Sequence, residues 1–471
     1  MDPPNKKSHP PTHITDLPET LIHHIFSYLS LHDTSQLSLS LKSWRNLCYN
    51  LPSLTLNIDE QINQHRFSSY LNFIDRLFLL RSQFPLQSLT IFSMLPILHN
   101  QFRVETWILH CLKGKIEELH LNLSWQFTPV LIREIFQCSS LKVLKLNLNS
   151  HYIPIQAPHV GFANLHCLSL TSVELPEDPF STWMGTKCSS ITTMNLIDCS
   201  GFTTLKINCA SLETLKICDP QFSKLCHLNI SSQELKTLHV ELYSPFQSEN
   251  SFTLFAPDLQ TITWIGRVVE KWNVCILTSM QTATIRVSIT ELPSNRRGAL
   301  GRFFWQIIES LQHVRSLHLC SASMLILALA MLKYKRSPSF EKMEYLKFSS
   351  CCTKLETCLV TYMLWRSCNL KTLVISAGTD DLTQRCHLIK EFQEYQNLKF
   401  DHGLKRAEIR LVDLGENNLE LAKFLLNNAK TLESLTLTYS ISDVDLAKKI
   451  HRELKDFQRP STLATIFLVP E

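Results

Sequence analysis

The sequence predicts an α/β protein in which a short helical segment precedes a long, irregular solenoid of stacked parallel strands. Three observations predict this class. A six-residue motif, L-x-x-L-x-L, returns many times after residue 85. Apolar residues at helical spacing fill several of the stretches between its copies, and the early segment TDLPETLIHHIFSYL (residues 15–29) carries apolar residues along one side of a helix.

The first helix is expected to begin near Pro18. Proline has no backbone N–H, and it is tolerated in the first helical turn because N–H groups there have no acceptor within the helix. Asp16 is suited to cap it, and Glu19 places a negative charge in the first turn. Its apolar side is formed by Leu21, Ile22, Ile25, Phe26 and Leu29. Such a stripe fits either a terminal helix packed on its own domain or a helix that docks on another protein.

The repeated motif predicts a leucine-rich-repeat solenoid. Copies between Leu141 and Met280 start 21 to 26 residues apart, and later copies start 27 to 34 residues apart. A motif that recurs at such a period is typical of leucine-rich repeats, in which each repeat adds one strand to a shared core. The copies start at Leu86, Ile116, Leu141, Leu165, Ile191, Leu212, Leu235, Leu259, Met280, Val314, Met343, Leu370 and Leu432, with a weaker copy at Leu404.

The stretches between the motifs predict what covers the sheet. Helical spacing runs through ETWILHCLKGK from Glu105, PVLIREIFQCSS from Pro129 and ALGRFFWQIIESLQ from Ala299. Between residues 191 and 240, half-period echoes (FTTLKI from Phe202 and LCHLNI from Leu225) indicate a second strand in each coil instead of a helix. We therefore expect a curved parallel sheet with helical and extended segments on its convex side.

The other face of the sheet offers small and polar side chains at the outward motif positions, such as Lys145, Thr214 and His239. This face is either a solvated surface or a recognition surface. For recognition, we expect the strongest contacts from aromatic residues outside the regular motif, namely Trp183, Trp264 and Trp305.

Composition excludes several classes of protein. The 46 Lys+Arg and 42 Asp+Glu residues nearly balance, and no basic stretch predicts a nucleic-acid interface. The longest apolar run, MLILALAML (324–332), is too short for a membrane span, and the polar, Pro-rich start does not resemble a signal peptide. We expect a soluble protein of the cytoplasm or nucleus, with no membrane or nucleic-acid partner.

No catalytic or metal centre is predicted. The sixteen cysteines include no CxxC pair, so neither a structural zinc module nor a RING is expected, and reduced buried thiols explain them better. Nucleotide-binding and hydrolase motifs such as GxGxxG, GxxxxGK[ST], GxSxG and HExxH are also missing. The sequence thus predicts neither an enzyme nor a cofactor.

Residues 14–50 resemble an F-box motif. The resemblance rests on Leu17-Pro18-Glu19, the Ile/Leu-rich first helix, a second helix capped at Asp33 with Gln36 three residues on, and the late Lys42-Ser43-Trp44-Arg45. One position departs from the family, which usually has serine where this sequence has Leu41. The resemblance implies that this segment docks on a Skp-type adaptor through Leu17, Pro18, Leu21, Ile22 and Ile25.

The resemblance extends toward the carboxyl end. An F-box followed by degenerate leucine-rich repeats is a common plant arrangement, and residues 403–437 are similar to the FBD-type region of such proteins. That similarity rests on a strand at Glu408-Ile409, a helix over 419–429 and a closing repeat strand. The predicted organisation is a disordered tail (1–12), an F-box (13–51), a repeat solenoid (52–379) and FBD-like repeats with a cap (380–471).

This resemblance implies a non-catalytic substrate receptor of a Skp–cullin–F-box ubiquitin ligase. The F-box would bind the adaptor, and through it the cullin, while the repeats would hold a protein substrate that the sequence does not identify. Two alternatives stay open: a repeat scaffold with no ligase role, which Leu41 favours, and a receptor that needs a small molecule. The second would require clusters of Arg and Lys on consecutive repeats, whereas the sequence offers isolated cases such as Lys145, Lys216 and Lys236.

Overall fold

The computed structural model divides into two compact units, Met1–Gly201 and Phe202–Glu471. It describes residues 17–26, 29, 31, 33–34, 50–58, 64–81, 85–93, 100–153, 162–219, 224–243, 249–288, 297–324, 326–327, 339–350, 354–377, 403–410, 416–439, 444–455 and 464–470. The predicted tail, most of the second F-box helix with Leu41 and Trp44, and residues 378–402 lie outside these ranges.

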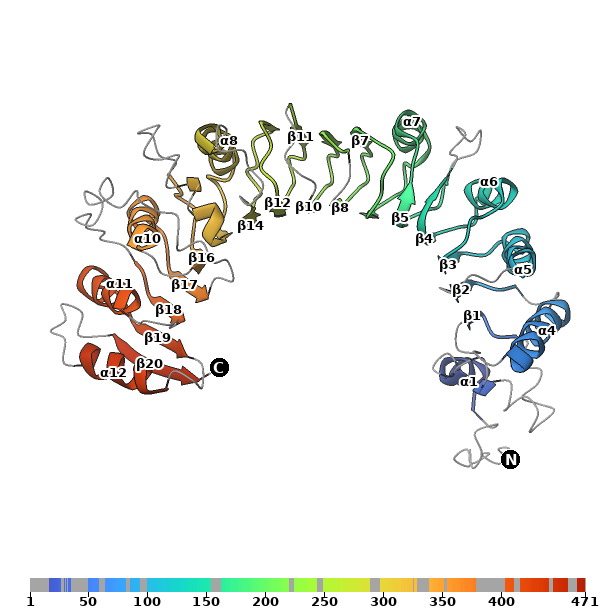
Figure 1. Ribbon diagram of the computed structural model, residues 1–471, viewed down its shortest axis with the longest axis horizontal. Helices are drawn as coiled ribbons and strands as arrows, with labels where there is room; N and C mark the ends of the chain where they lie inside the picture. Colours follow the sequence, from blue (N-terminus) through green and yellow to red (C-terminus); the bar gives the residue numbers. More distant parts are fainter. Residues whose placement is uncertain are drawn as a thin grey trace, which may run out of the picture. The chain divides into compact units, whose positions relative to one another are not determined.

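The first unit begins with the short helix α1 and continues as a parallel sheet whose strands follow chain order from β1 to β6. Helices α4 to α7 lie on one side of these strands (Figure 1). The bounds are α1 (Glu19–Phe26), β1 (Ser53–Asn57), α4 (Gln64–Leu80), β2 (Ser88–Ser93), α5 (Gln101–Lys113), β3 (Glu118–Leu123), α6 (Pro129–Gln137), β4 (Val143–Tyr152), β5 (Cys167–Glu174), α7 (Glu177–Lys187) and β6 (Thr193–Ile197).

The second unit contains a parallel sheet in the order β8-β10-β12-β14-β15-β16-β17-β18-β19-β20, and a four-stranded sheet in the order β13-β11-β9-β7. The bounds of its first half are β7 (Thr204–Asn208), β8 (Thr214–Asp219), β9 (His227–Ser231), β10 (Thr237–Leu242), β11 (Ser251–Phe255), β12 (Thr261–Gly266), β13 (Lys271–Val274) and β14 (Thr282–Val287). The second half comprises α8 (Arg297–Ser310), β15 (Ser316–Leu319), β16 (Tyr345–Ser350), α10 (Lys354–Arg366), β17 (Thr372–Ala377), β18 (Arg406–Arg410), α11 (Glu416–Asn428), β19 (Ser434–Tyr439), α12 (Val444–Lys455) and β20 (Thr465–Pro470).

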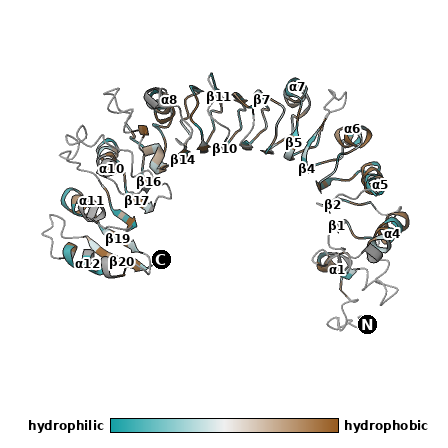
Figure 2. Cartoon of the chain, viewed as in Figure 1, coloured by the Kyte–Doolittle hydropathy of each residue, from teal (hydrophilic) through white to brown (hydrophobic). Residues whose placement is uncertain are grey.

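This architecture confirms the predicted α/β solenoid. In most motif strands the side chains alternate between buried and half-exposed, because successive residues of a strand point to opposite faces. Three expected helices are present as α5, α6 and α8, and the half-period echoes form β7 and β9 of the second sheet. The helices carry apolar and polar segments side by side in Figure 2, as expected of elements with one buried face.

The interior of each unit contains aromatic clusters. In the first unit, Trp183 on α7 packs against Phe136, Phe162 and Phe180 with ring centroids 5.3 to 6.0 Å apart. In the second, Phe252, Trp264 and Trp272 lie within 4.9 Å of one another, centroid to centroid. Offset and tilted contacts at such distances add to the free energy gained by burying the rings.

The prediction that Trp183 and Trp264 form a recognition surface is therefore wrong. Their side chains are 1% and 0% exposed, so they stabilise the core and cannot contact a partner. Trp264 is the last residue of its motif copy, a position that every neighbouring repeat also buries. Trp305 lies half-buried on α8.

Two polar contacts fix the helices of the first unit. Buried Glu105 on α5 accepts hydrogen bonds from the backbone nitrogen (2.9 Å) and the hydroxyl (2.8 Å) of Thr128. Thr128 is in turn the N-cap of α6, its hydroxyl accepting from the Leu131 nitrogen, and Pro129 follows at the first helical position.

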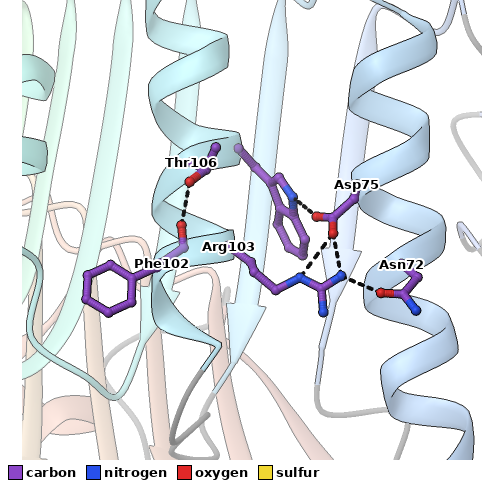
Figure 3. Close-up of polar contacts among 6 residues, drawn as sticks. Asn72, Asp75, Phe102, Arg103 and Thr106 are labelled. Carbon is purple, nitrogen blue, oxygen red and sulfur yellow. Dashed lines mark hydrogen bonds and ion pairs between the residues drawn. The ribbon is translucent and has the colours of Figure 1, made fainter.

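The second contact joins α4 to α5. Asp75 on α4 contacts Arg103 on α5, which also donates to Asn72 (Figure 3).

The FBD-like region has the predicted elements. Glu408 and Ile409 lie in β18, and the expected helix is α11, which starts three residues earlier than predicted, at Glu416. Leu421 and Leu425 are buried on one side of α11, as the spacing of its apolar residues indicated. β18 and β19 then pair in parallel, which continues the sheet of the second unit.

Candidate functional site: the first helix and the open face of the repeats

Helix α1 divides its apolar residues between two sides. Ile22 and Phe26 are buried inside the protein, with 4% and 3% of their surface exposed. Leu21 is 49% exposed, Leu29 is 36% exposed, and Pro18 is exposed as well. One side of this stripe therefore packs internally, and the other leaves large apolar groups in solvent.

The predicted adaptor contacts fall into two groups on this helix. Pro18 and Leu21 are exposed, and Leu17 and Ile25 are half-buried, so these four side chains are accessible to a partner. The side chain of Ile22 is buried in the protein by itself, and its contact with an adaptor stays a prediction.

The turn after α1 also differs from expectation. Leu31, Asp33 and Thr34 have helical backbone, so Asp33 already lies within a helical turn and is not the predicted N-cap. Leu31 and Thr34 are buried. The first turn of α1 agrees better with the sequence, because the carbonyl of Pro18 accepts from the nitrogens of Leu21 (2.9 Å) and Ile22 (3.2 Å).

The face of the first sheet that lacks helices, here called the open face, contains a pocket. It is a cavity of about 240 Å³ across strands β2 to β5. Phe92 is its exposed aromatic group, with 40% of its surface in solvent. The polar side chains that line it are Thr90, His120, Asn122, Lys145, Asn147, Ser169 and Thr171.

Strand register brings these residues together. Thr90 pairs with His120, His120 with Lys145, and Lys145 with Ser169, so the same motif position forms a row across four repeats. The position of each residue within its motif predicts that the side chain faces outward, but the pocket itself depends on how the strands align. The signal that could have found it is this column of polar residues one repeat apart.

The electrostatics of the pocket favour a polar ligand group. Burial lowers the pKa of His120, and the nearby Lys145 ammonium lowers it further, so the imidazole is neutral at physiological pH. His120 Nε2 and Asn122 Oδ1 are enclosed without a hydrogen-bond partner among the described residues. The groups that the pocket offers to a ligand are hydroxyls, amides and the Lys145 ammonium.

Known protein families match both the segment that contains α1 and the repeats. Residues 14–59 match the F-box-like family, and residues 104–292 match the leucine-rich repeats of FBD-associated F-box protein At5g56370. Among the described residues, every helix is too short or too polar to cross a lipid bilayer.

Curated relatives from Arabidopsis thaliana are F-box proteins by name. Putative F-box/FBD/LRR-repeat protein At4g03220 is 26% identical over 492 residues, covering 96% of this chain and 94% of the relative. F-box/LRR-repeat protein At4g14103 is 26% identical over 35% of this chain, and FBD-associated F-box protein At4g13985 is 28% identical over 35%. The last two matches span less than half of the relatives' own lengths, 43% and 37%. With the repeat fold, these matches show an F-box-like segment followed by leucine-rich repeats in this chain, which is similar to plant F-box/leucine-rich-repeat proteins with an FBD-associated region.

Proposed function

We propose that this protein is the substrate receptor of a Skp–cullin–F-box ubiquitin ligase. The observation that carries the proposal is the F-box-like match over residues 14–59 together with the solvent-exposed apolar side of α1. An exposed Leu21 beside Pro18 is the kind of surface that a partner's apolar groove covers, because interface energy concentrates in a few buried aliphatic and aromatic groups.

In this function the protein is a bridge and not a catalyst. The F-box binds a Skp-type adaptor, the adaptor binds the cullin, and the repeats hold the substrate near a charged ubiquitin-conjugating enzyme. Tethering raises the effective concentration of substrate lysines at that enzyme without new chemistry in this chain. The protein would act in the cytoplasm, the nucleus or both.

The substrate would contact the pocket on the open face of β2 to β5. Phe92 supplies an exposed apolar surface, Lys145 a positive charge, and the threonine and serine side chains supply hydroxyl groups. A protein segment with an apolar side chain next to a carboxylate or amide matches this set.

Binding to the adaptor is tested by co-purification of the full chain with a plant Skp protein. We expect the wild type to retain the adaptor and the double variant Leu17→Ala/Pro18→Ala to lose about thirtyfold to a thousandfold in affinity, which corresponds to about 2–4 kcal/mol. Leu21→Ala should weaken binding alone. Thr20→Ala, an exposed polar position on the same helix, is the matched control and should bind like the wild type.

Failure of the wild type to bind the adaptor would instead indicate a repeat scaffold without a ligase role. The pocket is tested separately, by comparing proteins that co-purify with the wild type and with Phe92→Ala/Lys145→Ala, with the bound adaptor as the reference. Loss of a ubiquitinated protein at constant adaptor supports the pocket. Constant recovery of every such protein contradicts it.

A further inference from the structure

A second cluster of chemically reactive side chains lies in the second unit, on the face of β8 and β10 turned away from the four-stranded sheet. Cys218 is on β8, and His239 and Glu241 are on β10. Each side chain is half-buried. One sulfur, one nitrogen and one carboxylate oxygen from the three residues all lie within 4.8 Å of one another.

Repeat geometry creates this cluster. Glu241 pairs with Cys218 across the two parallel strands, although the two are one whole repeat apart in sequence. His239 precedes Glu241 by two residues and therefore points to the same face of the strand. Close pairs such as CxxC are unnecessary here, because the stacking of repeats replaces the short loop that normally brings ligands together.

The donor set is that of a zinc site. Thiolate and imidazole ligands select Zn²⁺ over Mg²⁺ and Ca²⁺, which prefer oxygen. Tetrahedral zinc with bonds of about 2.0–2.3 Å needs ligand atoms about 3.5 Å apart, a separation that small side-chain rotations reach from the present positions. A thiolate and a carboxylate also balance the two charges of the ion.

The surroundings orient the carboxylate for this role. The Tyr243 hydroxyl donates to Glu241 Oε2 at 2.9 Å, which leaves Oε1 facing the His239 Nε2 atom 2.5 Å away. A partner that holds the second oxygen of a ligating carboxylate is a regular feature of metal sites.

Two cationic side chains lie near the cluster, because Lys216 on β8 pairs with His239 and Arg286 on β14 lies near Tyr243. The thiolate and the carboxylate therefore have to supply the negative charge that a bound cation needs. The neighbours of His239 and Glu241 on β12 are the uncharged Thr263 and Ile265. We propose that Cys218, His239 and Glu241 form a three-ligand Zn²⁺ site, with the fourth position open to water or to a side chain of a bound protein.

The experiment is a zinc titration of the full-length protein, stripped of metal with a chelator and held under reducing conditions, in competition with a chromophoric zinc indicator. We expect one more equivalent of tightly bound Zn²⁺ in the wild type than in Cys218→Ser or His239→Gln. Replacing zinc with Co²⁺ should give a thiolate-to-cobalt charge-transfer absorption that Cys218→Ser abolishes.

Matched controls are available in the first unit. His120 occupies the same motif position as His239, and Cys167 is a half-buried cysteine on β5. His120→Gln and Cys167→Ser should leave the zinc stoichiometry unchanged. Circular dichroism of each metal-free variant shows whether it is folded. Equal zinc stoichiometry in the folded wild type, Cys218→Ser and His239→Gln would overturn the proposal and leave a hydrogen-bonded His239–Glu241–Tyr243 group without a metal.

Discussion

Asp75 on α4 accepts a hydrogen bond of 2.7 Å from the indole nitrogen of Trp107 on α5, and the same carboxylate contacts Arg103 one turn earlier on α5. Figure 3 shows the carboxylate between the two helices. The Asp75→Asn variant keeps the shape of the side chain but removes its charge. We expect a loss of about 1 kcal/mol in the free energy of unfolding, modest because the ion pair is partly exposed to solvent.

The measurement is urea unfolding followed by tryptophan fluorescence, which reports on Trp107 among others. Arg133 and Glu134 form a more exposed pair on α6, and Arg133→Ala is the control, with an expected change within about 0.5 kcal/mol. An Asp75→Asn variant as stable as the wild type would mean that apolar packing alone holds α4 on α5.

Gly266 at the end of β12 requires the absence of a side chain. Its φ is +104°, and a Cβ atom would lie 2.0 Å from the carbonyl oxygen of Leu242. Gly266→Ala should therefore lower the free energy of unfolding by on the order of 3 kcal/mol, through both backbone strain and the clash. Gly403→Ala is the control, because no atom lies within 4 Å of its Cβ position. Thermal unfolding compares the two variants, and similar melting temperatures would contradict this account.

The cysteines should differ sharply in reactivity. Burial raises the pKa of the Cys111 thiol to about 12, even though the neighbouring Arg81 guanidinium acts in the opposite direction. Because the thiolate is the reactive species, Cys111 should resist iodoacetamide at pH 8, whereas the exposed Cys368 should be labelled. Mass spectrometry after a short labelling pulse measures both sites. Cys111 should be labelled only in urea, and equal labelling of both residues in the native protein would show that its environment opens readily.

His318 on β15 should contribute to the pH dependence of stability. Burial lowers its pKa, and Lys347 and Arg286 lower it further, so the folded protein binds this proton less readily than the unfolded chain. The stabilisation is complete above the unfolded pKa, near 6.5, and is lost as the pH falls through that value toward the folded pKa.

We therefore expect the melting temperature of His318→Gln to fall less between pH 8 and pH 5 than that of the wild type. The comparison at pH 8, where the imidazole is neutral in both states, corrects for lost contacts with Thr284 and Ser316. Parallel curves for the two proteins would show that His318 is protonated equally well in the folded and unfolded states.

The fold could be predicted from the sequence because its strongest signals are local. Alternation of apolar and polar residues over six positions defines each strand. The second sheet was predicted as well, by extra motif copies such as FTTLKI at β7. The periodicity of α1 identified its apolar residues but could not divide them between interior and solvent, because that division depends on what α1 packs against. The sequence alone therefore did not separate buried Ile22 from exposed Leu21.

The sites were harder to predict, because their residues meet only through register. Nothing within a short window of sequence connects Cys218 to Glu241, and a search for close cysteine pairs passes over them. The prediction that tryptophans form the recognition surface was wrong for the opposite reason. Trp264 already occupies a motif position that each repeat buries, so its local pattern indicated the core and outweighs the general preference for tryptophan at interfaces.

The regular register of the strands has an evolutionary consequence. Each half-exposed position is paired with the same position of the next repeat, as Thr90, His120, Lys145 and Ser169 show, while the leucines between them point into the core. A substitution on the exposed side thus changes one surface position, which is defined by its repeat and by its place in the strand. The buried layer stays intact. Such a surface can diversify its specificity through single changes, with little loss of foldability along the way.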